Sequence, residues 1–165
     1  MAKFNYLVKK THHHLDNPYN DTKSEVFMVS GLPGTGKDYY IKENLSYLPV
    51  ISLDEIRKDL GIKPTDKQGK VIQTAKEKAR EYMRKGENFV WNATNTTKRM
   101  RTELISFFTE YNSFINIIFL NKDLDLILEQ NKNRDQKVPE NVIIKLYKKM
   151  EIATPDEAHN VSIIS

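Results

Sequence analysis

The sequence contains no cysteine, so a disulfide framework and a zinc site built on thiolate ligands are both excluded. It also has no internal repeat, no low-complexity segment and no apolar stretch that approaches the length of a membrane span. The N-terminus lacks the apolar core of a secretory signal peptide. We therefore expect an intracellular protein of the cytoplasm that does not act at a membrane.

The bulk composition is that of an ordinary globular domain. The chain has 165 residues, of which 39% are apolar and 29% are charged, and this length is enough for one domain with a substantial core. The net charge of +4, with a pI near 9.1, fits an anionic partner such as nucleic acid. A lysine-rich solvated surface has the same composition, so charge alone leaves both interpretations open.

The first 24 residues differ in composition from the rest of the chain. They are mostly polar and show neither helical periodicity nor a clear strand. We expect residues 1–24 to be an N-terminal arm or linker and residues 25–165 to form the folded domain. Consecutive histidines, His12 to His14, lie in the arm, but adjacent side chains rarely converge on one metal ion, so we expect no metal site there.

From residue 26 onward the pattern alternates between strands and helices. Short apolar runs predict strands at 26–30, 49–51, 89–91, 114–120 and 161–164. Helical spacing of apolar residues predicts helices over 37–45, 53–60, 66–85, 98–111, 124–128 and 139–150. This alternation predicts an α/β fold of three layers, in which helices cover both faces of a mostly parallel five-stranded sheet. Ligands of such sheets bind at the carboxyl ends of the strands.

A phosphate-binding loop follows the first predicted strand. The segment Gly31-Leu32-Pro33-Gly34-Thr35-Gly36-Lys37-Asp38 matches the P-loop pattern G-x-x-x-x-G-K-[ST] at every defined position except the last. In such loops the backbone N–H groups surround the phosphates, the lysine contacts the β and γ oxygens, and a hydroxyl holds Mg²⁺. The sequence therefore predicts a site for a nucleotide triphosphate, formed by Gly31, Pro33, Gly34, Thr35, Gly36, Lys37 and Asp38.

The misfit in the loop has a counterpart at a neighbouring strand end. Asp38 stands where the hydroxyl is expected, and Asn92 ends the third strand, where P-loop enzymes usually carry an acidic residue. We interpret the two as one exchange, in which the carboxylate has moved from the strand end to the loop. Because one direct carboxylate together with phosphates is a normal Mg²⁺ site, Asp38 is the predicted ligand of Mg²⁺ or Mn²⁺.

A pair of charged residues follows the second strand. Asp54 is a carboxylate at a strand end, where it can accept the proton of an attacking hydroxyl. Arg57 lies three residues later, on the same side of the predicted helix. The same spacing is equally compatible with a structural role, in which Asp54 caps the helix and Arg57 only pairs with it.

Basic and polar residues surround these strand ends. The polar segment 131–138 predicts a lid between two helices that brings Arg134 over the phosphates as an arginine finger, with a solvated loop as the alternative. Lys98, Arg99 and Arg101 follow the third strand, and residues 66–85 hold seven Lys or Arg against three Asp or Glu. Such groups contact phosphates in nucleic acids, but no aromatic residues interleave with them to indicate base stacking.

Residues 26–150 resemble the P-loop polynucleotide 5′-kinases, which transfer the γ-phosphate of an NTP to a 5′-OH end of RNA or DNA. The resemblance rests on the P-loop, on Asp54-Glu55-Ile56-Arg57, on Ala93-Thr94-Asn95, and on Arg134 followed by Val138-Pro139. It implies that Asp54 is the general base, and that Lys37 and Arg134 stabilise the transferring phosphoryl group. It also implies ATP or another NTP as donor, and an acceptor site made of Arg57, Asn92, Thr94, Asn95, Lys98 and Arg101.

A bacterial subgroup of these kinases is more similar still, through Gly-Lys-Asp at 36–38, Trp-Asn-Ala-Thr-Asn at 91–95 and Glu-Ala-His at 157–159. In that subgroup the kinase is the C-terminal module of a protein whose N-terminal part is an HD-type phosphohydrolase. The resemblance implies that this chain is an excised module or a free-standing relative, acting in nucleic-acid repair beside a phosphohydrolase or ligase module. For His159 it leaves both a functional role and a plain surface position open.

Two other functions stay open at this point. A small-molecule kinase of the same fold would phosphorylate a nucleoside, sugar or antibiotic hydroxyl, because acceptor choice depends on the site and not on the fold. A non-catalytic nucleotide-binding regulator is favoured by the changed residue at Asp38. The basic helices favour a polyanionic acceptor over a small neutral one.

Overall fold

The computed structural model describes residues 22–165, so most of the predicted arm, with His12 to His14, lies outside the described residues. The strands in this part are β1 (Ser24–Gly31), β2 (Val50–Ser52), β3 (Phe89–Asn92), β4 (Ser113–Leu120) and β5 (Asn160–Ile164). The helices are α2 (Lys37–Asn44), α3 (Leu53–Leu60), α4 (Gly69–Lys85), α5 (Lys98–Thr109), α6 (Leu124–Lys132) and α7 (Glu140–Lys149). Each of them corresponds to an element predicted from the sequence.

The strands form one sheet in the order β2-β3-β1-β4-β5, and every neighbouring pair is parallel. The central strand β1 is buried along its whole length, as expected for an apolar run with neighbours on both sides. Its Val26 pairs with Phe89 on one side and with Ile115 on the other. The predicted α/β fold is confirmed, and among the described residues the sheet is fully rather than mostly parallel.

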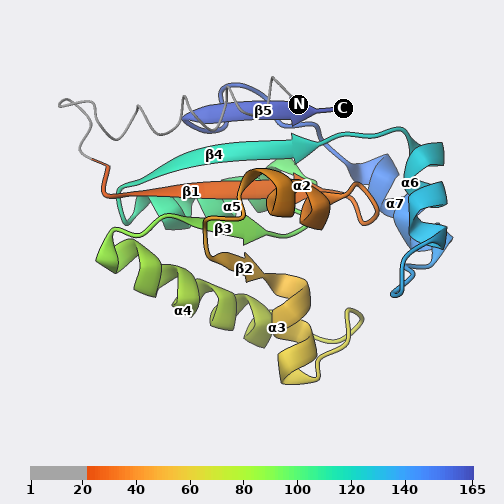
Figure 1. Ribbon diagram of the computed structural model, residues 1–165, viewed down its shortest axis with the longest axis horizontal. Helices are drawn as coiled ribbons and strands as arrows, with labels where there is room; N and C mark the ends of the chain where they lie inside the picture. The colour runs from red at the N-terminus through yellow and green to blue at the C-terminus, as the bar shows by residue number, and fades with distance from the viewer. Residues whose placement is uncertain (1–21) are drawn as a thin grey trace.

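Helices cover both faces of the sheet. On one face α4 and α5 pack over the larger core, in which Trp91 of β3 contacts Phe108 of α5 with ring centroids 5.5 Å apart. On the other face α2 contributes Tyr40 and Ile41 to a smaller core with β1. Figure 1 shows α2 on the near side of the sheet, and α6 and α7 beyond the carboxyl ends of the strands. The fold therefore places two helices next to the sheet edge where ligands of parallel sheets bind.

Three predicted boundaries are corrected by the structure. Helix α4 begins at Gly69 rather than Asp66, because the Asp66 carboxylate accepts from the Lys63 backbone N–H at 2.9 Å and closes a turn instead. Strand β1 begins at Ser24, within the predicted arm. In α7, Pro139 is the residue before the first helical turn, and not the first helical residue.

The C-terminal tail ends in the predicted fifth strand, and His159 directly precedes it. The Nδ1 atom of His159 accepts a hydrogen bond from the Ile115 backbone N–H at 3.1 Å, and the ring stacks on Phe114. Burial lowers the pKa of His159, which favours the neutral form that this bond requires. The ring of this histidine is covered by Phe114 on one face, and its bond to Ile115 extends the pairing of β4 with the tail.

A search of the helices within residues 22–165 for one long and apolar enough to cross a membrane finds none.

Candidate active site

The P-loop joins the carboxyl end of β1 to the first turn of α2. Its first residue, Gly31, donates its N–H to the Thr94 carbonyl at 2.9 Å, and the Thr35 hydroxyl donates to the Leu32 carbonyl at 2.8 Å. Gly34 has a φ of 88°, and a Cβ there would lie 2.9 Å from the Ile127 carbonyl oxygen of α6. Because backbone cannot move aside, glycine is required at this position. The loop is therefore bonded to the segment that follows β3 and lies against α6.

The Lys37 ammonium lies over its own loop. Its Nζ donates to the Gly31 carbonyl at 2.9 Å and to the Leu32 carbonyl at 3.1 Å. Burial lowers the pKa of Lys37 to about 8, with Asp54 and Asp38 opposing this shift and Arg134 adding to it. At neutral pH the side chain is mostly charged, as a phosphate ligand requires. The pKa of this one ammonium group is thus influenced by three charged side chains, those of Asp54, Asp38 and Arg134.

The predicted pair of Asp38 and Asn92 is in direct contact. Asn92 Nδ2 donates to Asp38 Oδ1 at 2.8 Å, across 54 residues of sequence. Asn92 is buried at the end of β3, whereas Asp38 is exposed in the first turn of α2, so the amide orients the carboxylate. No set of three or more His, Cys, Asp or Glu side chains converges anywhere in residues 22–165. A divalent ion at Asp38 would therefore take its other ligands from phosphates and water, which suits Mg²⁺ or Mn²⁺.

Asp54 and Arg57 form an ion pair on the first turns of α3. The Ser52 hydroxyl, and not Asp54, accepts from a backbone N–H at the start of this helix, so the capping interpretation of Asp54 is wrong. The Asp54 side chain is 72% exposed and lines the cavity described below. Arg57 Nε donates to Gln68 Oε1 at 2.6 Å. Gln68 therefore orients Arg57, a contact that sequence reasoning missed because the residue lies in a turn before α4.

The polar segment 131–138 is more ordered than its composition indicates. Helix α6 continues through its first residues to Lys132, and Asn131 is buried. The Asn131 amide donates to the Val138 carbonyl at 2.7 Å and accepts from the Val138 N–H at 3.0 Å. These two bonds close the loop that carries Arg134, and Arg134 lines the cavity. Residues 132, 133 and 135–137 are exposed, so the lid and the solvated loop both stay open as interpretations.

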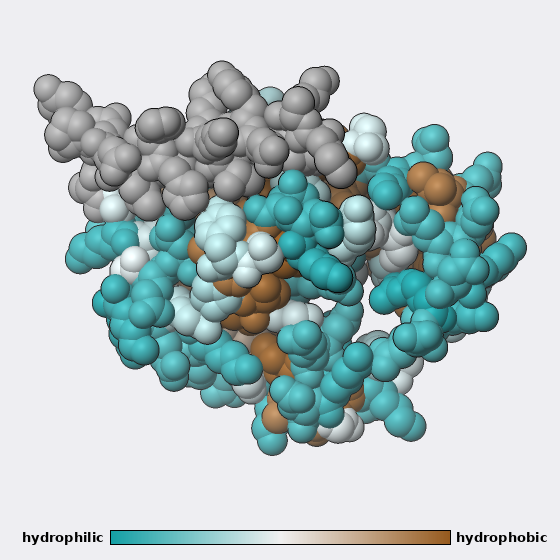
Figure 2. Space-filling view, viewed as in Figure 1, coloured by the Kyte–Doolittle hydropathy of each residue, from teal (hydrophilic) through white to brown (hydrophobic). Residues whose placement is uncertain are grey.

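A cavity of about 620 Å³ opens at the carboxyl ends of β1 and β3. Figure 2 shows this side of the molecule hollowed between the part formed by α6 and α7 and the part formed by α3. The cavity brings together most of the predicted site residues, namely Pro33, Gly34, Gly36, Lys37, Asp38, Asp54, Arg57, Asn92, Thr94, Asn95 and Arg134. Four predicted residues do not line it, namely Gly31, Thr35, Lys98 and Arg101.

The predicted acceptor contact of Arg101 does not fit its placement. Arg101 is completely buried and forms a two-bond ion pair with Glu157, whose side chain is 2% exposed. Lys98 is half-exposed, and its ammonium lies 3.7 Å from the Asp156 carboxylate. Both side chains are turned toward the C-terminal tail because its acidic residues attract them, and that tail is more than 50 residues away in the sequence.

An apolar wall of the cavity was missed at the sequence level. Ile72, Met100 and Val142 are between 40% and 43% exposed, and all three line the cavity from α4, α5 and α7. The helical spacing of apolar residues in 98–111 and 139–150 includes Met100 and Val142, but periodicity identifies an apolar face and not what it faces. Tyr39 and Trp91 also line the cavity, so aromatic side chains are present here although none interleaves with the basic residues in sequence.

Comparison of the sequence with known protein families gives a match over most of the chain. Residues 26–152 match the model of AAA_33, a family described as AAA domain. The chain belongs to the AAA_33 family. Among curated proteins, the AAA_33 chain is similar to the L-seryl-tRNA(Sec) kinase of Methanococcus maripaludis, with 25% identity over 138 residues that cover 76% of the chain and 52% of the relative. It therefore spans about half the length of that relative.

Solved structures share the fold of this AAA_33 protein. The Chaetomium thermophilum Kti12 in complex with ADP-AlF3 has a TM-score of 0.66 and 14% identity, over 85% of this chain and 88% of that one. A gluconokinase from Sinorhizobium meliloti 1021 has a TM-score of 0.59 and 14% identity, over 86% and 82%. At this identity the likeness shows the fold alone. That fold is the P-loop kinase fold, and with the P-loop it implies binding of a nucleotide such as ATP.

Proposed function

We propose that this protein is a polynucleotide 5′-OH kinase, which transfers the γ-phosphate of ATP or another NTP to a 5′-OH end of RNA or DNA during end healing. One observation carries the proposal. The cavity that contains Lys37 and Arg134 also contains the Asp54–Arg57 pair, so phosphate-binding cations and a candidate general base face the same space. An acceptor hydroxyl at Asp54 is then next to the phosphate that it attacks.

The transfer needs little from the protein beyond positioning and charge. Asp54 accepts the proton of the 5′-hydroxyl while the oxygen forms a bond to Pγ and the bond from Pγ to the leaving diphosphate oxygen breaks. Lys37 and Arg134 balance the charge that spreads over the phosphoryl oxygens. Arg57, held by Gln68, contacts the acceptor phosphate, and Asn92, Thr94 and Asn95 complete the acceptor side of the cavity.

Asp38 would hold Mg²⁺ or Mn²⁺ together with phosphate oxygens and water, and the ion would neutralise charge on the transferring phosphates when bound. The Asn92 amide bonded to Oδ1 sets the direction of the carboxylate. In the usual pair, a serine in the P-loop and an aspartate at the strand end together carry one negative charge. Asp38 and Asn92 would carry the same charge, with the carboxylate in the loop and the neutral side chain at the strand end.

The exchange is testable by reversing it. Asp38→Ser is expected to lower activity by at least about 10-fold and to raise the Mg²⁺ concentration needed for half-maximal activity, because the proposed carboxylate ligand of the ion is lost. The double change D38S/N92D restores a serine in the loop and a carboxylate at the strand end, and we expect it to recover much of the loss. Rates are measured across a Mg²⁺ series. Higher activity of D38S with an unchanged Mg²⁺ dependence would contradict the assignment.

The surroundings of the cavity support a nucleic-acid acceptor. Lys76 of the basic helix α4 lines the cavity with Arg57, which provides two cations for phosphodiester groups. The apolar wall around Met100 suits the flat face of a base better than the many hydroxyls of a sugar. The name of the curated relative, L-seryl-tRNA(Sec) kinase, describes a kinase whose acceptor hydroxyl is carried on RNA.

A small-molecule kinase is the second candidate. It is favoured by the volume of the cavity, which matches a drug-sized ligand, and by the structural likeness to a gluconokinase. A non-catalytic nucleotide-binding regulator is the third, because Asp38 replaces the usual hydroxyl. As an end-healing kinase the protein would act in the cytoplasm, beside a phosphohydrolase of the HD type or a ligase module.

Incubation of the protein with γ-labelled ATP, Mg²⁺ and matched 5′-OH RNA and DNA oligonucleotides tests the function. We expect label at the 5′ end, and none on the same oligonucleotides that already carry a 5′-phosphate. Label transferred to gluconate or free nucleosides but not to oligonucleotides would support the small-molecule kinase. ATP binding without transfer to any acceptor would support the regulator.

A further inference from the structure

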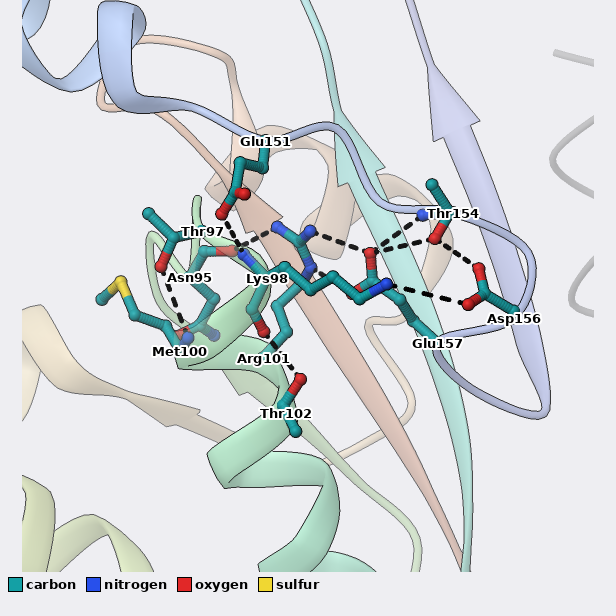
Figure 3. Close-up of polar contacts among 10 residues, drawn as sticks. All are labelled: Asn95, Thr97, Lys98, Met100, Arg101, Thr102, Glu151, Thr154, Asp156 and Glu157. Atoms are coloured by element: carbon teal, nitrogen blue, oxygen red, sulfur yellow. Dashed lines mark hydrogen bonds and ion pairs between the residues drawn. The ribbon is translucent and has the colours of Figure 1, made fainter.

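Arg101 and Glu157 form an ion pair that is almost completely withdrawn from solvent. Arg101 Nε donates to Glu157 Oε2 at 2.7 Å, Nη2 donates to Oε1 at 3.0 Å, and the two side chains are 0% and 2% exposed. Figure 3 shows the guanidinium between α5 and the tail, with Glu157 on one side and the Asn95 carbonyl on the other. The pair therefore links two segments that are 56 residues apart in the sequence.

Stability alone is a weak explanation for such a pair. Two charges lose their hydration when they are buried, and apolar residues of similar volume often stabilise a fold equally well or better. The third bond of the guanidinium indicates another role, since Nη1 donates to the Asn95 backbone carbonyl at 3.1 Å. Asn95 belongs to the loop that follows β3 and lines the cavity.

Asn95 has a conformation that needs support. Its φ is 41°, in the left-handed region that asparagine adopts more readily than other non-glycine residues but that still limits its backbone, and the residue is buried. Its side-chain Nδ2 is buried and has no hydrogen-bond partner within residues 22–165. An unpaired amide at this depth is costly unless a water or a ligand satisfies it, and the residue lines the candidate acceptor side of the cavity.

The carbonyls on both sides of Asn95 are held as well. Thr94 O accepts from Gly31 N at the start of the P-loop at 2.9 Å, and Thr96 O accepts from Glu151 N at 2.8 Å. Three consecutive carbonyls of this loop are thus bonded to the P-loop, to Arg101 and to the segment after α7. The Arg101 bond is the middle one, at the residue with the left-handed backbone.

We propose that the Arg101–Glu157 pair is a positioning device for the acceptor site. It fixes the Asn95 carbonyl, and through it the direction of the Asn95 amide, which donates to an oxygen of the acceptor strand. Arg101 itself does not contact the acceptor. An arginine is needed because its planar fork makes three bonds at once to Glu157 and Asn95, which a lysine ammonium cannot match. This proposal rests on the proposed function, because the acceptor it positions is an oligonucleotide.

The double change R101M/E157M tests the role without leaving one charge buried alone. KM values for ATP and for a 5′-OH oligonucleotide are measured for the wild type and the variant, together with the thermal unfolding midpoint. We expect KM for the oligonucleotide to rise about 10- to 100-fold, because a misplaced contact group costs that much in comparable sites. KM for ATP and the unfolding midpoint should remain close to those of the wild type.

Two further variants complete the test. R101K keeps the charge but loses the fork, and we expect a smaller rise in the oligonucleotide KM; it also serves if the double variant does not fold. The matched control is R80M/E77M, which removes an exposed Arg–Glu pair of α4 that does not line the cavity. It should leave both KM values unchanged.

The outcomes separate this role from the function on which it depends. A wild-type protein that transfers no phosphate to the oligonucleotide overturns both proposals. An active wild type whose R101M/E157M and R101K variants keep the wild-type oligonucleotide KM overturns the positioning role alone. A rise in the KM values for both ATP and the oligonucleotide, together with a lowered unfolding midpoint, would show a purely structural pair and would overturn the positioning role too.

Discussion

Arg134→Met is expected to lower kcat about 1,000-fold or more, because an arginine that balances the charge on a transferring phosphoryl group contributes on that scale. The residue lines the cavity beside Lys37, on a loop closed by the two hydrogen bonds between Asn131 and Val138. Those bonds do not involve the Arg134 side chain, so the loop should keep its conformation in the variant. Steady-state rates with ATP and a 5′-OH oligonucleotide measure the effect.

The matched control lies in the same loop. Lys137 is exposed and does not line the cavity. Lys137→Met therefore removes a positive charge from the loop that carries Arg134 without removing one from the cavity. We expect kcat close to that of the wild type. If R134M and K137M had the same small effect, Arg134 would be only part of a solvated, positively charged loop.

Asp54→Asn is expected to lower kcat by about 10²- to 10⁴-fold, the range typical for loss of a general base. Asparagine has the same shape and still accepts a hydrogen bond from Arg57, but it does not take a proton at neutral pH. Because the Asp54 side chain is largely exposed, the change should not lower the free energy of unfolding. Equilibrium binding of ATP in the absence of acceptor should be retained.

Glu55→Gln is the control for this change. Glu55 is the next residue of α3, is also exposed, and does not line the cavity. Its loss removes one carboxylate from the same helix turn, so an electrostatic effect of lost charge would appear in both variants. A D54N protein with near wild-type kcat would contradict the assignment of Asp54 as the base, and would leave Asp54 as a partner of Arg57 alone.

Local patterns predicted the elements and the nucleotide side of the site. Helix α3 is an example, because its predicted range of 53–60 agrees with the structure, where Ser52 and a left-handed Gly61 bound the helix within a few residues. The capping residue itself was missed, since Asp54 was the candidate. The P-loop is another example. Its glycines have positive φ angles, and Lys37 donates to carbonyls of the same loop, so all of these contacts are local in the sequence. The contact of Asp38 with Asn92 followed from the rule that parallel strands end at one edge of the sheet.

The rest of the cavity was predicted less well, because it depends on contacts between distant segments. Arg101 has the sequence context of a phosphate-binding residue, yet it is buried by a carboxylate from the tail. Met100 and Val142 have the spacing of core residues, yet the packing of α5 and α7 leaves them facing the cavity. Neither placement is encoded within the helix that carries the residue.

The sequence by itself determined the α/β class, the order of the elements and the P-loop motif with Asp38 at its last position. These depend on periodicity, turn chemistry and a motif that is contiguous in the chain. Only the tertiary structure decided which basic residues reach the cavity and which are used to hold the tail. The physical reason is that an arginine is equally suited to a phosphate and to a carboxylate, and which one it meets is set by the packing of segments more than 50 residues apart.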